Sequence, residues 1–177
     1  MAHGDNITLS TLRATVHLGA HADGPNHYGK NAPSIDERSL DHYLGSCQVI
    51  RVNIGRATRV EMSILHNEIT APRVLFATGT YPDPENWNKD FAALSVELID
   101  FLHERGVIMI GIDTPSVDLF ESKDLPAHKA MLRHNMSILE GLVLKAVPEG
   151  IYELIALPLP LVGFDASPVR AMLRAMV

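Results

Sequence analysis

Residues 91–116, FAALSVELIDFLHERGVIMIGIDTPS, decide the fold class. Apolar residues at positions 91, 94, 98, 101 and 102 recur at helical spacing and predict a helix over residues 91–105. Asn88 or Asp90 can cap the start of this helix, and Gly106 can end it. The apolar run that follows, residues 107–112, is too short for a helix and is typical of a buried strand. This helix–strand unit indicates a protein of mixed α and β structure.

Similar patterns continue on both sides of this unit. Runs rich in apolar and β-branched residues predict further strands over residues 7–18, 47–54, 73–78, 142–144 and 152–157. Pro126 suits the first turn of a helix over residues 126–134, and Ser167 with Pro168 predicts a last helix that reaches Met176. Strands and helices are interleaved over 177 residues without a linker between them, so we expect one mixed α/β domain.

Composition narrows the classes of function. The chain has 15 Lys and Arg against 21 Asp and Glu, and no basic stripe that could neutralise phosphates, so we expect no nucleic-acid partner. Cys47 is the single cysteine, which excludes an internal disulfide and a thiolate-rich zinc site. No apolar run approaches the roughly 20 residues of a membrane span, and the start of the chain does not read as a signal peptide. We therefore expect a cytoplasmic protein that has no membrane partner.

Three histidines and one aspartate fall within residues 17–27, HLGAHADGPNH. His17, His21 and Asp23 lie at even spacing with Gly19 between them, so an extended strand would point them the same way. Imidazole and carboxylate ligands suit zinc, and manganese or iron less exclusively; two histidines and one carboxylate also leave a position open for water. A lone histidine beside a glycine is usually an ordinary loop residue, but this grouping favours a metal site.

The stretch from His17 to His27 reads H-x-G-x-H-x-D-x-P-x-H and resembles the signature of the metal-dependent cyclase family. The resemblance continues through residues 110–116, 121–123, 127–128, 138–141 and 165–171, and its later parts are most similar to the kynurenine formamidase (arylformamidase) branch. It implies a barrel-like core of mixed β-sheet with surrounding helices, of the swivelling β/β/α type, and a homodimer.

The resemblance also implies a centre of two zinc ions per subunit, although the same ligands accept manganese and other divalent ions. In the family pattern, the histidines that match His17 and His21 bind one ion, and the histidine that matches His128 binds the other. The carboxylates that match Asp23 and Glu140 bridge both ions. His27 matches the acid/base residue, since an imidazole can take up and release a proton near neutral pH.

The spacing of His128 and Glu140 adds one expectation of its own. Twelve residues apart on one continuous helix, they would lie about 120° from each other, so they could not share a metal ion. A break between them is needed, and residues 135–137 are a plausible place for it.

The activity that the resemblance implies is hydrolysis of N-formyl-L-kynurenine, a small molecule, to formate and L-kynurenine in tryptophan degradation. A related hydrolase that opens isatin's cyclic amide is the closest rival. Two interpretations without catalysis also stay open: an inactive metal-binding member, and an interaction domain whose histidines are incidental. Bound metal without turnover would indicate the inactive member, and absence of stoichiometric metal the interaction domain.

The chain also differs from the family pattern. It begins sixteen residues before His17, so we expect it to lack the family's N-terminal segment, whose tryptophan lines the substrate pocket. Trp87 reads as a loop anchor more readily than as a pocket wall, and Asp113 as the cap of its own turn. The predicted C-terminal helix offers a candidate subunit interface, although a core role is equally consistent.

Overall fold

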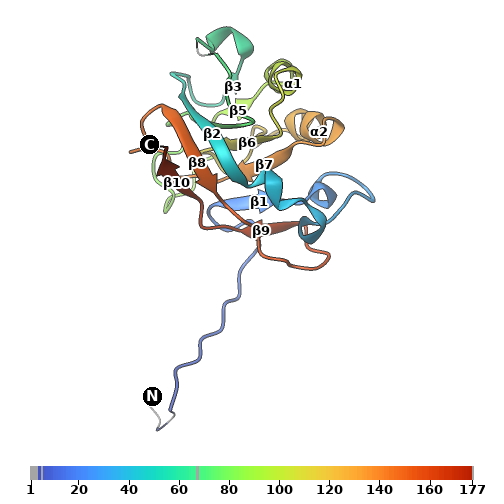
Figure 1. The fold of residues 1–177 in the computed structure, drawn as a ribbon, viewed down its shortest axis with the longest axis vertical. Helices are drawn as coiled ribbons and strands as arrows, with labels where there is room; N and C mark the ends of the chain where they lie inside the picture. Colours follow the sequence, from blue (N-terminus) through green and yellow to red (C-terminus); the bar gives the residue numbers. More distant parts are fainter. Residues whose placement is uncertain (1–3, 5, 67, 177) are drawn as a thin grey trace.

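An eight-stranded β-sheet forms the centre of the computed structural model, which describes residues 4, 6–66 and 68–176 (Figure 1). Its strands are β1 His21–Asp23, β2 Leu44–Arg51, β4 Arg73–Ala77, β6 Met109–Ile112, β7 Ser137–Glu140, β8 Gly150–Ile155, β9 Ala166–Pro168 and β10 Met172–Ala175. They are ordered β10-β8-β2-β4-β6-β7-β1-β9 across the curled sheet. The central strands β2, β4, β6 and β7 are parallel, and the outer strands pair antiparallel at both ends.

Two helices connect the parallel strands. α1 (Val96–Glu104) lies between β4 and β6 in the chain, and α2 (Pro126–Arg133) lies between β6 and β7. They run side by side (Figure 1), as expected for crossovers between parallel neighbours that no hairpin can join. The described residues also form the 3₁₀ helices Pro25–His27, Ile35–Glu37, Leu40–His42 and Met62–Ile64, and a small sheet of β3 (Arg59–Val60) and β5 (Ala93–Leu94). Among these helices, none is long and apolar enough to cross a membrane.

Apolar side chains cover both faces of the sheet, and β4 shows how. Val74 and Phe76 pack into the cluster that contains Leu98 of α1, whereas Leu75 and Ala77 pack into the cluster on the other face. This alternation is the period of two expected of a strand. Burying each large apolar side chain contributes roughly 1.5–3 kcal/mol, so the centre of the sheet is fixed from both sides.

The helix–strand unit predicted over residues 91–112 is confirmed, with a later start. Residues 93–94 pair with β3, so the helix begins at Val96. Ser95 caps it, because its Oγ accepts a hydrogen bond from the Leu98 main-chain N–H at 3.1 Å. The expected caps were wrong: Asn88 and Asp90 lie in the preceding loop, where they bond to each other.

The break expected between His128 and Glu140 is also confirmed. α2 begins at Pro126 as predicted and ends at Arg133. Asn135 then adopts a left-handed conformation with φ of 53°, which asparagine tolerates better than most residues, and reverses the chain. β7 begins at Ser137 and ends at Glu140. A strand, which the sequence patterns did not predict, therefore carries this carboxylate.

The strand predicted over residues 7–18 is wrong. Most of this segment is extended but projects away from the sheet (Figure 1), and residues 7–18 form no strand in the described structure. The strand comes later and is short, because β1 covers only His21–Asp23. The predicted strands at 47–54, 73–78 and 152–157 correspond to β2, β4 and β8 with shifted ends.

Two predictions for the second half of the chain are wrong as well. Residues 142–144 form no strand, because the sheet position is taken by β7 just before them. The predicted C-terminal helix is instead the strands β9 and β10, since pairing with β1 and β8 overrides the local helical signal. The candidate interface on that helix becomes an edge strand whose Met172 is 48% exposed.

Candidate metal centre

The pairing of β1 with β7 brings together side chains from opposite parts of the chain. In this antiparallel pair His21 lies directly opposite Glu140, and Asp23 shares the face of His21 two residues later. All three residues are buried. His21 Nε2 lies 3.3 Å from Glu140 Oε2 and 3.5 Å from Asp23 Oδ1. The register of the sheet therefore fixes these three groups.

His17 reaches the same place by a turn rather than by a strand. The sequence spacing predicts one extended strand through His17, Gly19 and His21, and this prediction is wrong. Gly19 has φ of +62°, a left-handed conformation that glycine adopts without strain, and the chain bends there. The His17 ring thereby packs 4.9 Å from the His21 ring, and its Nδ1 lies 3.3 Å from Asp23 Oδ1.

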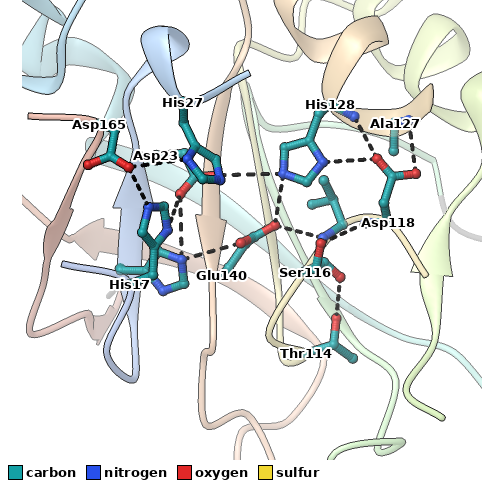
Figure 2. Close-up of polar contacts among 12 residues, drawn as sticks. His17, Asp23, His27, Thr114, Ser116, Asp118, Ala127, His128, Glu140 and Asp165 are labelled. Carbon is teal, nitrogen blue, oxygen red and sulfur yellow. Dashed lines mark hydrogen bonds and ion pairs between the residues drawn. The ribbon is translucent and has the colours of Figure 1, made fainter. Parts of the chain in front are cut away.

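His128 approaches from the other side, on α2. Its Nε2 lies 3.6 Å from Asp23 Oδ2 and 3.6 Å from Glu140 Oε1. Asp23 and Glu140 thus lie between the two histidine groups, and each turns one oxygen toward His21 and the other toward His128. Figure 2 shows both carboxylates beside His128. The Val117 main-chain N–H donates to Glu140 Oε1 at 2.7 Å and holds that carboxylate in place.

The second nitrogen of each buried histidine is engaged outside the centre. His21 Nδ1 donates to the Gly19 carbonyl at 2.8 Å, and His128 Nδ1 donates to Asp118 Oδ2 at 2.9 Å. His17 Nε2 lies 3.1 Å from Asp165 Oδ2. Such contacts fix the orientation of each ring and leave its other nitrogen facing the centre, which is the usual support of a metal-binding histidine.

The carboxylates hold protons on the histidines. Burial opposes the charge on His128, but its hydrogen bond to Asp118 and the nearby Asp23 carboxylate outweigh burial and raise its pKa to about 10. Burial likewise opposes the charge on His17, and Asp23 and Asp165 raise its pKa to about 9. The pKa of His21 is also raised, because burial is outweighed by Glu140. Burial disfavours the Asp23 carboxylate, yet the pKa of Asp23 is lowered by the histidines around it.

The donor set fits a metal ion. His21 Nε2 and both oxygens of Asp23 are buried and have no hydrogen-bond partner among the described residues. Buried polar atoms are nearly always satisfied, so these atoms point to a missing partner. Ligand atoms bound at 2.0–2.1 Å to a tetrahedral zinc ion lie about 3.3–3.4 Å apart. The contacts of 3.3 to 3.6 Å around Asp23 and Glu140 are equal to this spacing or slightly longer.

His27 lies at the rim of this centre. Its ring is 4.2 Å from the His17 ring and 6.2 Å from the His128 ring. Its Nδ1 lies 3.3 Å from Asp165 Oδ2, the same oxygen that faces His17 (Figure 2). His27 is about one-third exposed, unlike the buried groups, so a small molecule can reach it. The structure thus gathers all six residues named from the sequence. Two groups of donor atoms are close enough to hold a metal ion: His21 with Asp23 and Glu140, and His17 with Asp23 and His27.

A cavity of about 360 Å³ opens beside His17 and His21. Trp87 and Tyr81 line it, with ring centroids 6.0 Å apart, and so do residues 141–145. Trp87 is 58% exposed, yet its ring packs edge-on 6.1 Å from the buried Phe91, so it contacts the core and also forms part of the cavity wall. Asp113 also lines the cavity and does not cap its own turn: its oxygens accept hydrogen bonds from the turn at residues 78–79.

Two supporting residues had no assigned role in the sequence analysis. Asp118 orients His128 and also accepts hydrogen bonds from the main-chain N–H groups of residues 127 and 128. Asp165 contacts both His17 and His27. Neither position shows a spacing that links it to the histidines, because both contacts form only through the tertiary fold. Asp165 does fall within the last stretch that resembles the family.

Comparison with known proteins agrees with this geometry. A family model described as a putative cyclase matches residues 2–119. The chain belongs to the cyclase family. A curated relative from Bordetella petrii, named kynurenine formamidase, is 44% identical over 171 residues, which cover 96% of this chain and 82% of the relative.

Two solved structures with similar folds are described as metal-dependent hydrolases. One, a potential metal-dependent hydrolase with cyclase activity, is 29% identical with a TM-score of 0.82, covering 91% of this chain and 80% of that chain. The other, a predicted metal-dependent hydrolase from Bacillus stearothermophilus, is 28% identical with a TM-score of 0.78, covering 95% and 82%. The mixed sheet and the candidate metal centre are therefore found in a chain whose family relatives are hydrolases.

Proposed function

We propose that this chain is a metal-dependent amidase that hydrolyses N-formyl-L-kynurenine to L-kynurenine and formate, a step of tryptophan degradation. The observation that carries the chemistry is the placement of Asp23 and Glu140 between His21 and His128, with one oxygen of each carboxylate turned to each side. The substrate follows from the 44% identical relative named kynurenine formamidase.

The ligand set that we infer holds two zinc ions per chain. His17 and His21 belong to one ion, His128 belongs to the other, and Asp23 with Glu140 is shared by both. Two bound ions would supply hydroxide from water at neutral pH and a Lewis acid for the amide carbonyl. The contacts to the outer histidine nitrogens hold the rings in place before any ion binds, which lowers the cost of assembling the site. Manganese suits the same imidazole and carboxylate ligands.

His27 is the residue that we assign to proton transfer. The leaving group is an aryl amine, and its nitrogen needs a proton to depart as a neutral amine. Asp165 accepts the Nδ1 proton of His27 at 3.3 Å and leaves Nε2 for the substrate. The cavity beside His17 and His21 provides room for the aryl ring, with the Trp87 and Tyr81 rings as its aromatic wall.

The first experiment measures metal content in protein purified without chelator, together with formate release from N-formyl-L-kynurenine. Two zinc ions per chain with rapid formate release is the expected result. Metal without formate release, combined with ring opening of isatin, would move the substrate to the cyclic amide. Metal without turnover of either substrate would indicate an inactive member, and protein without stoichiometric metal would overturn the proposal.

A His27→Ala variant separates the two roles open to this residue. We expect it to abolish turnover while both metal ions stay bound, because His27 lies outside the buried ligand group. His134→Ala is the matched control, since His134 follows α2 and pairs with Asp100 of α1, away from the candidate metal centre. Loss of one metal ion in His27→Ala, with full metal in His134→Ala, would make His27 a ligand and refute its assignment as the acid/base residue.

The family resemblance also leads us to propose a cytoplasmic homodimer. The edge strand β10, with Met172 exposed, and the exposed Met176 just after it are the candidate contact between subunits. Unpaired strand edges are ready templates for a second chain. Sedimentation of the purified protein at low and high concentration tests this, and a monomer at both concentrations would exclude it.

A further inference from the structure

Two cations line the cavity beside the candidate metal centre. Arg51 is the last residue of β2, and Lys145 lies in the segment that follows β7. Arg51 donates through one guanidinium nitrogen to the Leu144 carbonyl at 3.0 Å and to the Val147 carbonyl at 2.8 Å. The arginine thereby holds the segment that carries Lys145, so the two positive charges belong to one local structure.

Neither cation is neutralised by a side-chain ion pair among the described residues. Glu149 is near Arg51, but its carboxylate accepts from the Arg51 main-chain N–H at 2.8 Å. Asp113, the acidic residue of the cavity wall, accepts hydrogen bonds from the Thr78 main chain and hydroxyl and from the Gly79 main chain at 2.6 to 3.0 Å. The cavity therefore presents an excess of positive charge in a chain whose net charge is −6.

The rest of the cavity wall is aromatic and apolar. Trp87 packs edge-on at 6.0 Å from Tyr81 and stays 58% exposed, although a large aromatic side chain gains most when it is covered. Leu142 and Leu144 contribute apolar surface to the same cavity. A wall of this kind fits a planar ring, and the two cations fit an anionic group attached to that ring.

We propose that Arg51 and Lys145 bind the α-carboxylate of the substrate, so that the cavity selects aryl amides whose side chain carries a carboxylate over those that lack one. The inference rests on the proposed function and names the residues that set its substrate class. Hydrogen bonds from a cation to a carboxylate are stronger than neutral ones, and the planar guanidinium matches the carboxylate geometry. Both side chains are exposed, which reduces the effect of each charge.

The test compares two substrates that share the formylated ring. One is N-formyl-L-kynurenine, and the other is 2′-formamidoacetophenone, which lacks the amino-acid group. We expect Lys145→Gln to lower the ratio of kcat/KM for the first substrate to that for the second by about twofold to fivefold. Lys145→Arg, which keeps the charge, restores the ratio, and added salt lowers it in the unmodified protein.

Controls separate charge from loop structure. Lys123→Gln removes an exposed lysine that does not line the cavity, and we expect it to leave the ratio unchanged. Arg51→Gln also loses its bonds to the Leu144 and Val147 carbonyls, so it is compared with Arg51→Lys, which loses the same geometry but keeps the charge. A ratio that stays the same in Lys145→Gln and in Arg51→Gln overturns the proposal.

A binding measurement keeps the inference testable apart from turnover. Trp87 is the single tryptophan of the chain and lines the cavity, so its fluorescence reports L-kynurenine binding directly. We expect the Kd for L-kynurenine to rise about twofold to fivefold in Lys145→Gln and to be unchanged in Lys123→Gln. If neither substrate is hydrolysed, the proposed function fails while this titration still decides the carboxylate site; equal Kd values in both variants would refute it.

Discussion

Adding zinc to protein stripped with a chelator should release protons. His17 and His128 have pKa values raised to about 9 and about 10 by the carboxylates that they contact. Without a metal ion, both rings therefore carry a proton at about pH 7.5. A histidine must be neutral to bind a metal ion. Filling the site at that pH should therefore release about two protons per chain, and the raised pKa of His21 adds to this number.

Calorimetry in two buffers of different ionisation enthalpy measures this release. The apparent heat of zinc binding should differ between the buffers by about twice the difference in their ionisation enthalpies. The apparent affinity should also rise with pH until the pH passes about 9 to 10, where the rings are already neutral. Ionisation of a bound water adds protons, so two is the minimum.

One variant and one control sharpen the measurement. His17→Ala should release about one proton fewer than the unmodified protein, because it removes one of the protonated rings. His134→Ala, at the residue that follows α2 and pairs with Asp100, should release the same number as the unmodified protein. Stoichiometric zinc binding with release of less than about one proton per chain would refute the ion-paired network described for this site.

Three further outcomes follow from the same contacts. In chelator-stripped protein, the stabilisation from His17 and His128 is complete below about pH 6.5 and lost as the pH rises through about 9 and 10, so the melting temperature should fall across this range. Constant melting across it would contradict the raised pKa values. Asp118→Asn should weaken zinc binding about tenfold to a hundredfold, measured by competition with a chelator dye, because it removes the anionic partner of His128 Nδ1; unchanged affinity would mean that Asp118 is dispensable. Gly141→Ala should lower the free energy of unfolding, measured in urea, by about 1–3 kcal/mol, because φ is +67° there and a Cβ would collide with the Gly19 carbonyl. Unchanged stability would show that the main chains at Gly141 and Gly19 can move apart without cost.

Much of the sheet could be predicted from local patterns where strands are buried on both faces. The apolar runs at 73–78 and 107–112 gave β4 and β6, because continuous apolar sequence suits a central parallel strand. The ends of the sheet could not be predicted in this way. β9 and β10 carry a helix-like signal at Ser167 and Pro168, and only pairing with β1 and β8 makes them strands. β7 was missed because its four residues are too few to show a period.

The candidate site was predicted better than the geometry that forms it. Residue types and the family resemblance identified the histidines and carboxylates that the structure gathers. The expectation of one extended strand from His17 to Asp23 was wrong, because Gly19 turns the chain between them. Asp118 and the cavity cation Arg51 were not found, since their roles depend on contacts across the fold and leave no local pattern.

The position of β1 has a consequence for the order in which the chain can fold during synthesis. β1 lies between β7 and β9, so its neighbours are residues 137–140 and 166–168. On a ribosome, His21 and Asp23 emerge well before both flanking strands. The first strand of the sheet must therefore wait for residues 137–140 and 166–168 before it can enter its place. We therefore expect the histidines that begin the sequence motif to become ordered later than the strands β2, β4 and β6, and the metal centre to close only after Glu140 has emerged.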